Sequence, residues 1–256
     1  RSFLGGHVCR ALVNKGYRVL LHSTTSSHFE NLKDLLPNTQ ITPVICKYDD
    51  HQEISNLLNQ CSFFIHSSIP YFMQSIGMSD TANLEVEKFT FLLEHLLESN
   101  CKKSVFVSVC GTIGHQASGP ANEENQLESI SGWGHLKFKM KYENLVMDYC
   151  KKGLQAVVIN PTMLVGEQDC KPSSGELFIF LDSTVFNIMK DQKMNIVDVE
   201  DAASAAILAL EKGKIGERYI ISGNNIQTGD LTRAVKTLSN KRMPMITLPL
   251  GLMIAI

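Results

Sequence analysis

The stretch GWGHLKFKMKYE, residues 132–143, carries three side chains that can exchange protons. His135, Lys139 and Tyr142 are four and three positions apart, so a helix would bring them towards one face. A titratable group held one turn from a lysine could act as a proton relay. The same pattern also suits a solvated helix face, or a relay that has lost a member, and the spacing alone leaves all three interpretations open.

Composition excludes several classes of protein. A chain of 256 residues with 44% hydrophobic content can bury one large core, with room for a small appended lobe. The net charge of −2 and the lack of a basic run argue against a nucleic-acid partner. Seven scattered cysteines without a CxxC pair, and histidines without HxxxH or HExxH spacing, predict no metal site. Scattered cysteines also favour a reducing, cytoplasmic compartment.

The two ends of the sequence carry separate expectations. The chain begins at Arg1 rather than methionine, so we expect that a native start, with any targeting signal, lies upstream. No internal apolar run approaches the roughly 20 residues of a membrane span, so no clear membrane segment is predicted. The apolar stretch LPLGLMIAI at the end favours a helix of the small lobe, although a longer hydrophobic segment beyond Ile256 stays open.

Strand-like and helix-like patterns alternate along most of the chain. Near-continuous apolar strands between amphipathic helices predict an α/β fold with a doubly wound parallel sheet covered on both faces. Ligands of such sheets bind at the carboxyl ends of the strands. We expect strands at 17–22, 41–48, 62–68, 103–111, 154–161 and 218–223. We expect helices at 4–15, 29–36, 53–60, 83–99, 135–152, 197–212 and 228–239.

The opening RSFLGGHVCRALVNKGYRVLL looks like the second half of a dinucleotide-binding turn. Gly5 and Gly6 stand before the helix, where a backbone must approach a phosphate, while the preceding strand and earlier glycines are absent. The next strand ends in HSTTSS, where Ser23 and Thr24 could bond a ribose hydroxyl or a 2′-phosphate. Neither an acid nor an arginine is present there, so NAD and NADP stay open. A polar loop that caps the following helix is an equal alternative.

Three stretches carry a family resemblance: the FLGGHV turn, NPTMLVGEQDCKPSSG at 160–175, and NIVDVEDAASAAILALEKGKIGERYIISGNN at 195–225. Together they resemble the extended short-chain dehydrogenase/reductase superfamily of NAD-dependent epimerase/dehydratase type, near its dihydroflavonol-reductase and hopanoid-associated sugar-epimerase group. The resemblance implies a Rossmann domain at 1–165 whose first strand is missing. It also implies a mainly substrate-binding α+β lobe at 166–256, with some segments returning to the Rossmann domain.

The resemblance also implies the catalytic groups, and here the chain departs from the family. Members use a Tyr-x-x-x-Lys helix and a serine, and the lysine maps to Lys139 while His135 takes the tyrosine position. Val109 takes the serine position; Ser108 comes one residue early, and Thr112 could partly substitute. We therefore predict Lys139, His135 and Thr112 as catalytic residues. The implied contacts to NAD or NADP are Phe3, Leu4, Gly5, Ser23, Thr24, Ser67, Ser68, Lys139, Pro161, Leu164 and Ser173.

Geometry limits what the replacement can do. An imidazole nitrogen at 135 would lie about an ångström or more short of the tyrosine oxygen, and misplacement on that scale can cost about 10²-fold in rate. Lys139 would disfavour an imidazolium beside it. Tyr142 lies roughly 4–5 Å further along the axis than Lys139, at about 1.5 Å per residue, and so points to the wrong end. A capping or surface role for His135 is slightly favoured.

Three hypotheses of function follow. The first is an NAD(P)-dependent oxidoreductase or epimerase that acts on a hydroxyl or keto group of a small molecule, with a homodimer and a monomer both left open. The second is a catalytically degenerate protein that binds a dinucleotide as a sensor or interaction module, because both the tyrosine and the serine are lost. The third is a partial chain whose missing first strand leaves an open sheet edge. Sequence alone does not reveal the substrate.

Overall fold

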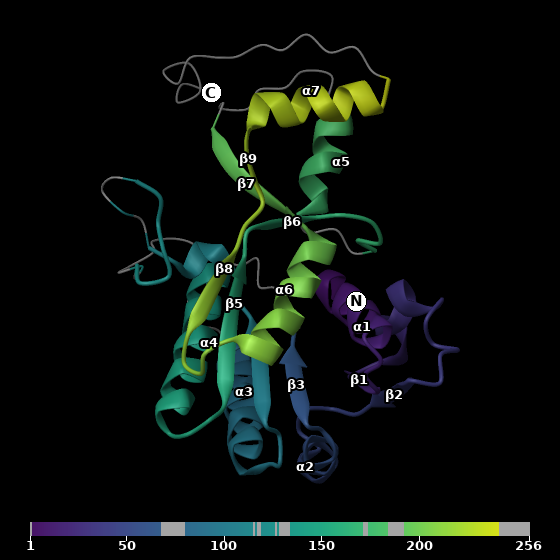
Figure 1. Cartoon of the computed structure of the whole chain (residues 1–256), viewed down its shortest axis with the longest axis vertical. Coiled ribbons are helices and arrows are strands. Elements are labelled where there is room, and N and C mark those ends of the chain that lie inside the picture. Colours follow the sequence, from purple (N-terminus) through teal and green to yellow (C-terminus); the bar gives the residue numbers. More distant parts are fainter. Residues whose placement is uncertain are drawn as a thin grey trace.

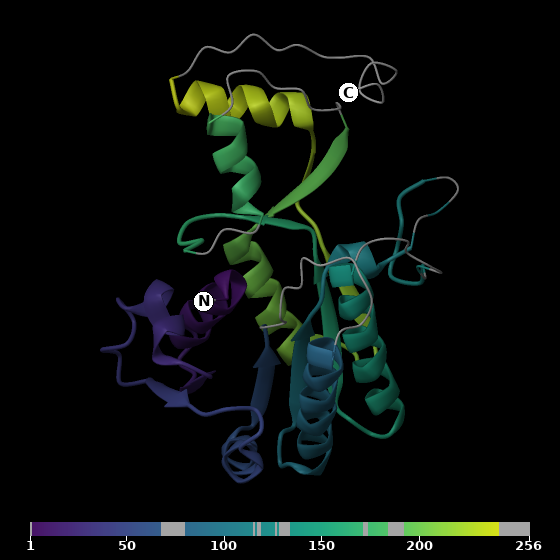
Figure 2. The same cartoon turned by 180° about the vertical axis from the view of Figure 1, so that it is seen from behind.

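The computed structural model describes residues 2–67, 80–114, 116, 119–125, 127, 134–170, 174–183 and 192–240. Figure 1 and its reverse view in Figure 2 show a larger lower body built on parallel strands, with a smaller region above it. Strands and helices alternate along the chain, as the hydrophobic pattern predicts.

A four-stranded parallel sheet forms the centre of the lower body. Its order is β3-β4-β5-β8, and every neighbouring pair is parallel. All six residues of β5 are buried, which explains its unbroken apolar sequence: a strand covered on both faces shows no polar alternation. The strands are β3 (Phe63–His66), β4 (Lys103–Val107), β5 (Ala156–Pro161) and β8 (Arg218–Ile221).

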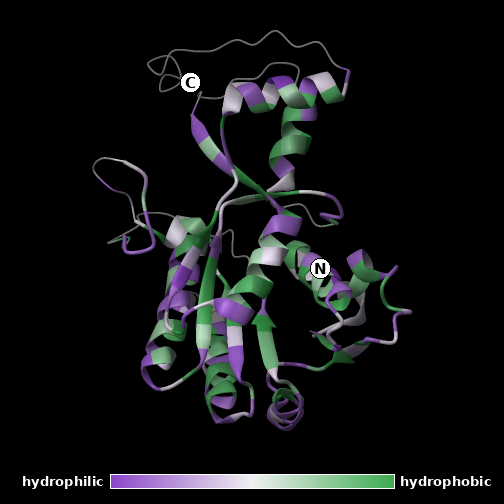
Figure 3. Ribbon diagram, viewed as in Figure 1, coloured by the Kyte–Doolittle hydropathy of each residue, from purple (hydrophilic) through white to green (hydrophobic). Residues whose placement is uncertain are grey.

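Helices cover both faces of this sheet. Alternate strand residues separate the two cores: Val105 and Val157 pack towards α1 and α6, whereas Phe106 and Val158 pack towards α2, α3 and α4. Figure 3 colours much of the central strands as hydrophobic, in keeping with their position between these two layers. This arrangement confirms the predicted doubly wound α/β fold. The helices are α1 (Phe3–Asn14), α2 (His51–Gln60), α3 (Asp80–Glu98), α4 (Gly134–Lys151) and α6 (Val199–Lys212).

The strands β1 (Val19–Ser23) and β2 (Ile41–Ile45) form a parallel pair of their own. In the described residues neither is paired with β3, the edge strand of the larger sheet. The helix expected at 29–36 is wrong: the structure has a 3-10 segment at Ser26–Leu32 instead. No side chain caps that segment, and Pro37 closes the region to a longer helix.

The upper region is built on a second small sheet with order β6-β7-β9. Sequence analysis missed its strands because they are largely half-exposed, and β6 and β9 have only three and four residues. It also began the next helix two residues too early. That helix, α6, begins at Val199 rather than at 197: Val197 and Asp198 end β7, and the Asp198 carboxylate accepts a bond of 2.7 Å from the Glu200 amide. The other elements here are β6 (Met163–Val165), α5 (Gly175–Ser183), β7 (Lys193–Asp198), β9 (Asn224–Gln227) and α7 (Thr228–Leu238).

Among the residues that the structure describes, no helix combines the length and apolar character needed to cross a bilayer.

Candidate functional site

Lys139 lies near the carboxyl end of the central sheet. Its charge acts on the imidazole of His66, the last residue of β3, so the two side chains face the same space. Burial lowers the pKa of Lys139 from 10.5 to about 8, and the Glu143 carboxylate opposes this fall. Among the described residues the ammonium has no hydrogen-bond or ion-pair partner. A half-buried, largely desolvated cation with no protein partner is suited to receive a ligand's oxygen atoms.

One helical turn after Lys139, Glu143 is the centre of a buried polar network. Its Oε1 accepts a bond of 2.9 Å from Arg218, and its Oε2 accepts one of 2.8 Å from the Asn160 amide. The Thr112 hydroxyl lies 2.8 Å from the same Oε2. The network therefore joins α4 to β5, to β8 and to the 3-10 turn Cys110–Thr112 that follows β4.

The predicted catalytic role of Thr112 does not fit this geometry. The hydroxyl proton can go to Glu143 or to the Val109 carbonyl, each 2.8 Å away, while Asn160 donates to the oxygen at 3.0 Å. The residue is 3% exposed. Its hydrogen-bonding groups are thus occupied within the protein, which favours a structural role over contact with a substrate.

Tyr142 is also structural. Its hydroxyl donates to the Glu85 carbonyl at 3.0 Å, and its ring stacks on Phe89 with centroids 4.0 Å apart. Burial, followed by the charge of Glu85, raises the pKa of the phenol, so it cannot serve as a base near neutral pH. This agrees with the geometric argument that it points away from the predicted site.

The end of β4 is followed by Ser108, the hydroxyl residue that comes one position before the predicted serine position. Ser108 is buried, its amide donates to the Ile159 carbonyl at 2.8 Å, and its Oγ has no partner among the described residues. Val109 supplies its main-chain carbonyl to the buried network but no side-chain hydrogen bond. Residue 109, which the sequence analysis predicts to take the serine position of the resembled family, thus offers no side-chain hydroxyl.

The start of α1 is fixed by Ser2. Its Oγ caps the helix by accepting from the Gly5 amide at 3.0 Å, and it donates to the Ser67 carbonyl, also at 3.0 Å. A Cβ on Gly5 would lie 2.5 Å from the Ser67 Oγ and 3.0 Å from the Ser2 Cβ, so a side chain there would force these serines to move. A Cβ on Gly6 would likewise collide with the Asn31 amide group. The glycine pair therefore allows α1 to approach Ser67, which directly follows β3, and the 3-10 segment that carries Asn31.

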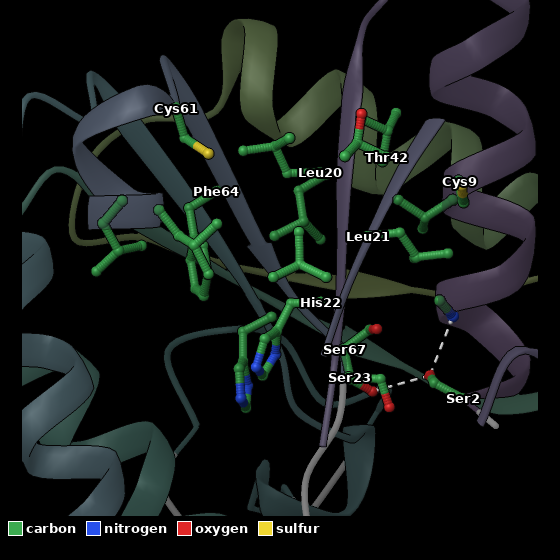
Figure 4. Close-up of a pocket in the computed structure, with 18 of the residues that line it drawn as sticks. Ser2, Cys9, Leu20, Leu21, His22, Ser23, Thr42, Cys61, Phe64 and Ser67 are labelled. Carbon is green, nitrogen blue, oxygen red and sulfur yellow. Dashed lines mark hydrogen bonds between the residues drawn. The ribbon is translucent and has the colours of Figure 1, made fainter. Parts of the chain in front are cut away.

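A cavity of about 1240 Å³ lies between β1 and β3. Figure 4 shows Cys61 at one end, Ser2, Ser23 and Ser67 at the other, and apolar side chains between them. Its polar end coincides with the carboxyl ends of both strands, where a ligand of an α/β sheet is expected. The apolar residues labelled in the figure are Leu20, Leu21 and Phe64.

His66 lines the same cavity, and sequence analysis did not select it. Its Nδ1 is buried without a partner in the described residues. Burial, and then the charges of Lys139 and His22, lowers the pKa of His66 from 6.5 to about 3, so the imidazole is neutral. Its place at the carboxyl end of a predicted parallel strand was the available signal. An unpaired buried nitrogen at that place could contact a ligand.

The remaining predicted contacts differ in what they offer. Leu4 is a core residue, and Phe3 and Leu164 pack partly buried against the same α1–α6 core. Ser23 is buried with its Oγ bonded to the Thr25 carbonyl at 2.9 Å, whereas Thr24 is exposed. Pro161 is buried at the end of β5. Ser68 and Ser173 lie outside the described residues, and for His135 only the backbone, in the first turn of α4, is described.

Potential metal ligands are dispersed. Within the described part of the chain, no group of three or more His, Cys, Asp or Glu side chains is placed to hold an ion. The seven cysteines are free thiols.

Comparisons with known proteins give the ancestry of this arrangement. The model of the NAD dependent epimerase/dehydratase family matches residues 1–222. The chain belongs to this family.

A Synechocystis protein with a provisional assignment as a dihydroflavonol 4-reductase is 24% identical over 259 residues, covering 98% of this chain and 74% of that protein. A nucleoside-diphosphate-sugar epimerase from Pseudomonas aeruginosa superposes with a TM-score of 0.81 at 22% identity, covering 98% and 80% of the two chains. UDP-glucuronic acid 4-epimerase from Bacillus cereus, solved with NAD, gives 0.78 at 20% identity, covering 96% and 84%. These structures establish the fold of the family member described here.

Proposed function

We propose that this epimerase/dehydratase family member is an NAD(P)-dependent oxidoreductase or epimerase that acts on a hydroxyl or keto group of a small molecule. The observation that carries the proposal is Lys139, a half-buried and largely desolvated ammonium at the carboxyl end of the sheet, with no partner among the described residues. Holding such a group desolvated is costly for the protein, and a ligand with hydroxyl groups would restore its hydrogen bonds.

The start of α1 fits a dinucleotide phosphate. The first four amides of a helix lack partners within it, and here Ser2 satisfies those of Gly5 and Gly6. The amides of Phe3 and Leu4 have no partner in the described residues, and the helix dipole favours an anion beside them. Phe3, Leu4 and Gly5 would thus act through their backbone, with Ser23 and Ser67 at the cavity wall.

Each residue on the chain has a limited task in this proposal. Bound NAD or NADP would take a hydride from a carbinol carbon or return one to a carbonyl carbon. Lys139 would hold ribose hydroxyls, and His135 at the start of α4 would take or give the proton on the substrate oxygen. In this proposal the buried Ser108 hydroxyl does not take over the role of the family's serine. The substrate oxygen therefore lacks the second hydrogen-bond donor that this serine provides in the family.

The names of the relatives support a sugar-like or polyhydroxylated substrate. The Bacillus cereus and Pseudomonas aeruginosa proteins are named for sugar nucleotides. Residues 174–183 and 192–198, above the carboxyl ends of the strands, would supply the substrate contacts in this chain.

Fluorescence titration with NADH and NADPH tests the proposal. Lys139→Met should weaken binding about tenfold or more, because it removes the buried charge. Lys137→Met, an exposed lysine on the same helix, is the matched control and should leave the Kd unchanged. The proposal would be refuted if neither cofactor bound to the native chain or to a second form with an added N-terminal strand.

This second form of the protein has an apolar strand and a glycine turn fused ahead of Ser2. The added strand is designed to occupy the cavity between β1 and β3. Binding by this form alone would show that the cavity must be filled before the phosphate end is organised. A fusion of equal length made of Gly and Ser is its control, since it cannot form a buried strand.

A catalytically degenerate dinucleotide-binding protein is the second candidate. Val109 at the serine position and the occupied Thr112 hydroxyl favour it. Under this alternative the native chain binds NADH without turnover, and His135→Tyr combined with Val109→Ser produces activity on a panel of carbonyl compounds. Turnover by the native chain on that panel would exclude it.

A further inference from the structure

Glu143 is a charged group buried inside the protein at a place where its neighbours leave it little freedom. Its side chain is 3% exposed, and three donors from three different elements bond to its two oxygens. A buried carboxylate is tolerated only when its charge is paired and its lone pairs are satisfied, and both conditions hold here.

The partner of Glu143 is itself held rigidly. Arg218 donates its Nε to the Glu123 carbonyl at 2.7 Å and its Nη2 to the Asn125 carbonyl at 2.6 Å, leaving Nη1 for Glu143. The carboxylate of Glu123 in turn accepts from the Ile220 amide of β8 at 2.9 Å. The guanidinium therefore cannot swing away without breaking several bonds, and α4 is anchored to β8 through it.

Lys139 stands four residues before Glu143 on the same helix, so both face the sheet. Any slide or rotation of α4 that displaced Lys139 would pull Glu143 out of its three bonds. Displacements of about 1 Å in a positioning group can cost about 10²-fold in rate. The bonds around Glu143 thus act on Lys139 through the rigid helix between them.

We propose that Glu143 is the positioning residue for Lys139: its bonds to Arg218, Asn160 and Thr112 fix α4, and with it the lysine, at the carboxyl end of the sheet. The inference rests on the proposed function only in that Lys139 contacts a cofactor. The Glu143 carboxylate has a second effect, because it keeps a negative charge one helical turn from the desolvated Lys139 ammonium.

The charged and titratable groups around Lys139 determine how the effect of Glu143 on the lysine can be measured. Glu143 faces it from α4, with Arg218 of β8 behind that carboxylate, and His66 faces it from β3. His66 stays neutral near pH 7, since its pKa is about 3. Between pH 6 and 10, a change in the titration of Lys139 after mutation of Glu143 therefore reports on the carboxylate.

The test compares Glu143→Gln with Asp148→Asn in the full chain. Both remove one negative charge from α4, but Asp148 is an exposed partner of Lys151. The ¹³Cε signal of Lys139, assigned with Lys139→Arg, is followed by NMR against pH without any cofactor. The midpoint should be near 8 in the native chain and about one pH unit lower in Glu143→Gln. It should be unchanged in Asp148→Asn, and an equal midpoint in the Gln variant would overturn the proposal.

A second variant guards against a Gln substitution that fails to fold. Thr112→Val removes one of the three donors to Glu143 and leaves every charge in place. Loosening α4 in this way should weaken NADH binding about threefold to tenfold without lowering the Lys139 midpoint. An unchanged Kd in a folded Thr112→Val chain would contradict the positioning role.

The two proposals can fail separately. If the native chain binds neither NADH nor NADPH, even with the fused strand, the proposed function falls, while the cofactor-free NMR titration still decides whether Glu143 controls Lys139. If binding is normal but the Glu143 and Thr112 variants leave both the midpoint and the Kd unchanged, the positioning role falls and the proposed function stands.

Discussion

The two sides of the candidate site are built differently. On the Lys139 side, formed by β4, β5, β8 and α4, buried strands are continuous and Glu143 is satisfied by three donors. On the Gly5 side, formed by α1, β1 and β2, the strands form a separate pair with a cavity of about 1240 Å³ between them and β3. Ser2, bonded to the Ser67 carbonyl, is one of the contacts between α1 and β3.

The difference shows that the parts that would hold a catalytic lysine and the parts that would hold a nucleotide are fixed by separate interactions. The position of Lys139 depends on residues of the central sheet and of α4. The position of the Gly5 turn depends on close approach to Ser67 and Asn31. A change on one side therefore need not disturb the other, and mutations can test this independence.

Replacing the arginine on each side should give the largest contrast. Arg218→Met leaves the buried Glu143 charge without its partner and should lower the free energy of unfolding by about 3–5 kcal/mol. Arg10→Met on the Gly5 side breaks a pair with Asp34, whose side chain is 61% exposed, and should cost about 1 kcal/mol. Urea unfolding followed by circular dichroism measures both. Equal losses would show that the two sides are equally dependent on their ion pairs.

Truncation of one apolar residue on each side should give an intermediate contrast. Ile159→Ala in β5 removes a side chain that is fully buried and should cost about 3 kcal/mol. Leu20→Ala in β1 removes one that already borders the cavity, so it should cost about 1 kcal/mol or less. The midpoint of the same urea transition reports the change. A cost above about 2 kcal/mol for Leu20→Ala would mean that the cavity is closed in solution.

The smallest effect should come from acid. The bond from Arg10 holds the pKa of Asp34 below its ordinary 3.8, so the stability it gives is present above that value. It is lost as the pH falls through the lower value of the folded state. Because Asp34 is exposed, the difference should stay below about 0.5 kcal/mol. Urea midpoints at pH 6 and pH 2.5 should converge for native chain and Asp34→Asn at the lower pH.

The sequence predicted the long elements of the central sheet and its helices better than the short strands of the upper region. Strands such as β5 and helices such as α4 were found because an unbroken apolar run or a helical period requires a particular partner surface. Strands of three or four residues, such as β6 and β9, carry too few positions to show a period. The 3-10 segment at Ser26–Leu32 resembles a helix over so short a span.

The candidate site was predicted less completely. The lysine was found through its family pattern, but the pairing of Glu143 with Arg218 joins residues 75 positions apart and has no local signature. The same holds for the unpaired Nδ1 of His66, which becomes visible only when neighbouring helices are packed against β3. Thr112 was predicted to be catalytic from its residue type, whereas the structure shows that its hydroxyl is bonded to Asn160 and Glu143, which sequence alone does not reveal.

Val109 joins the buried network through its main-chain carbonyl, which accepts from Thr112 and Asn160. Every amino acid supplies that same carbonyl, so the bonds that anchor this region place no demand on which side chain the position carries. These main-chain bonds therefore do not constrain the side chain at residue 109. A hydroxyl could be lost or restored there without breaking the bonds that anchor this region to Asn160 and Thr112.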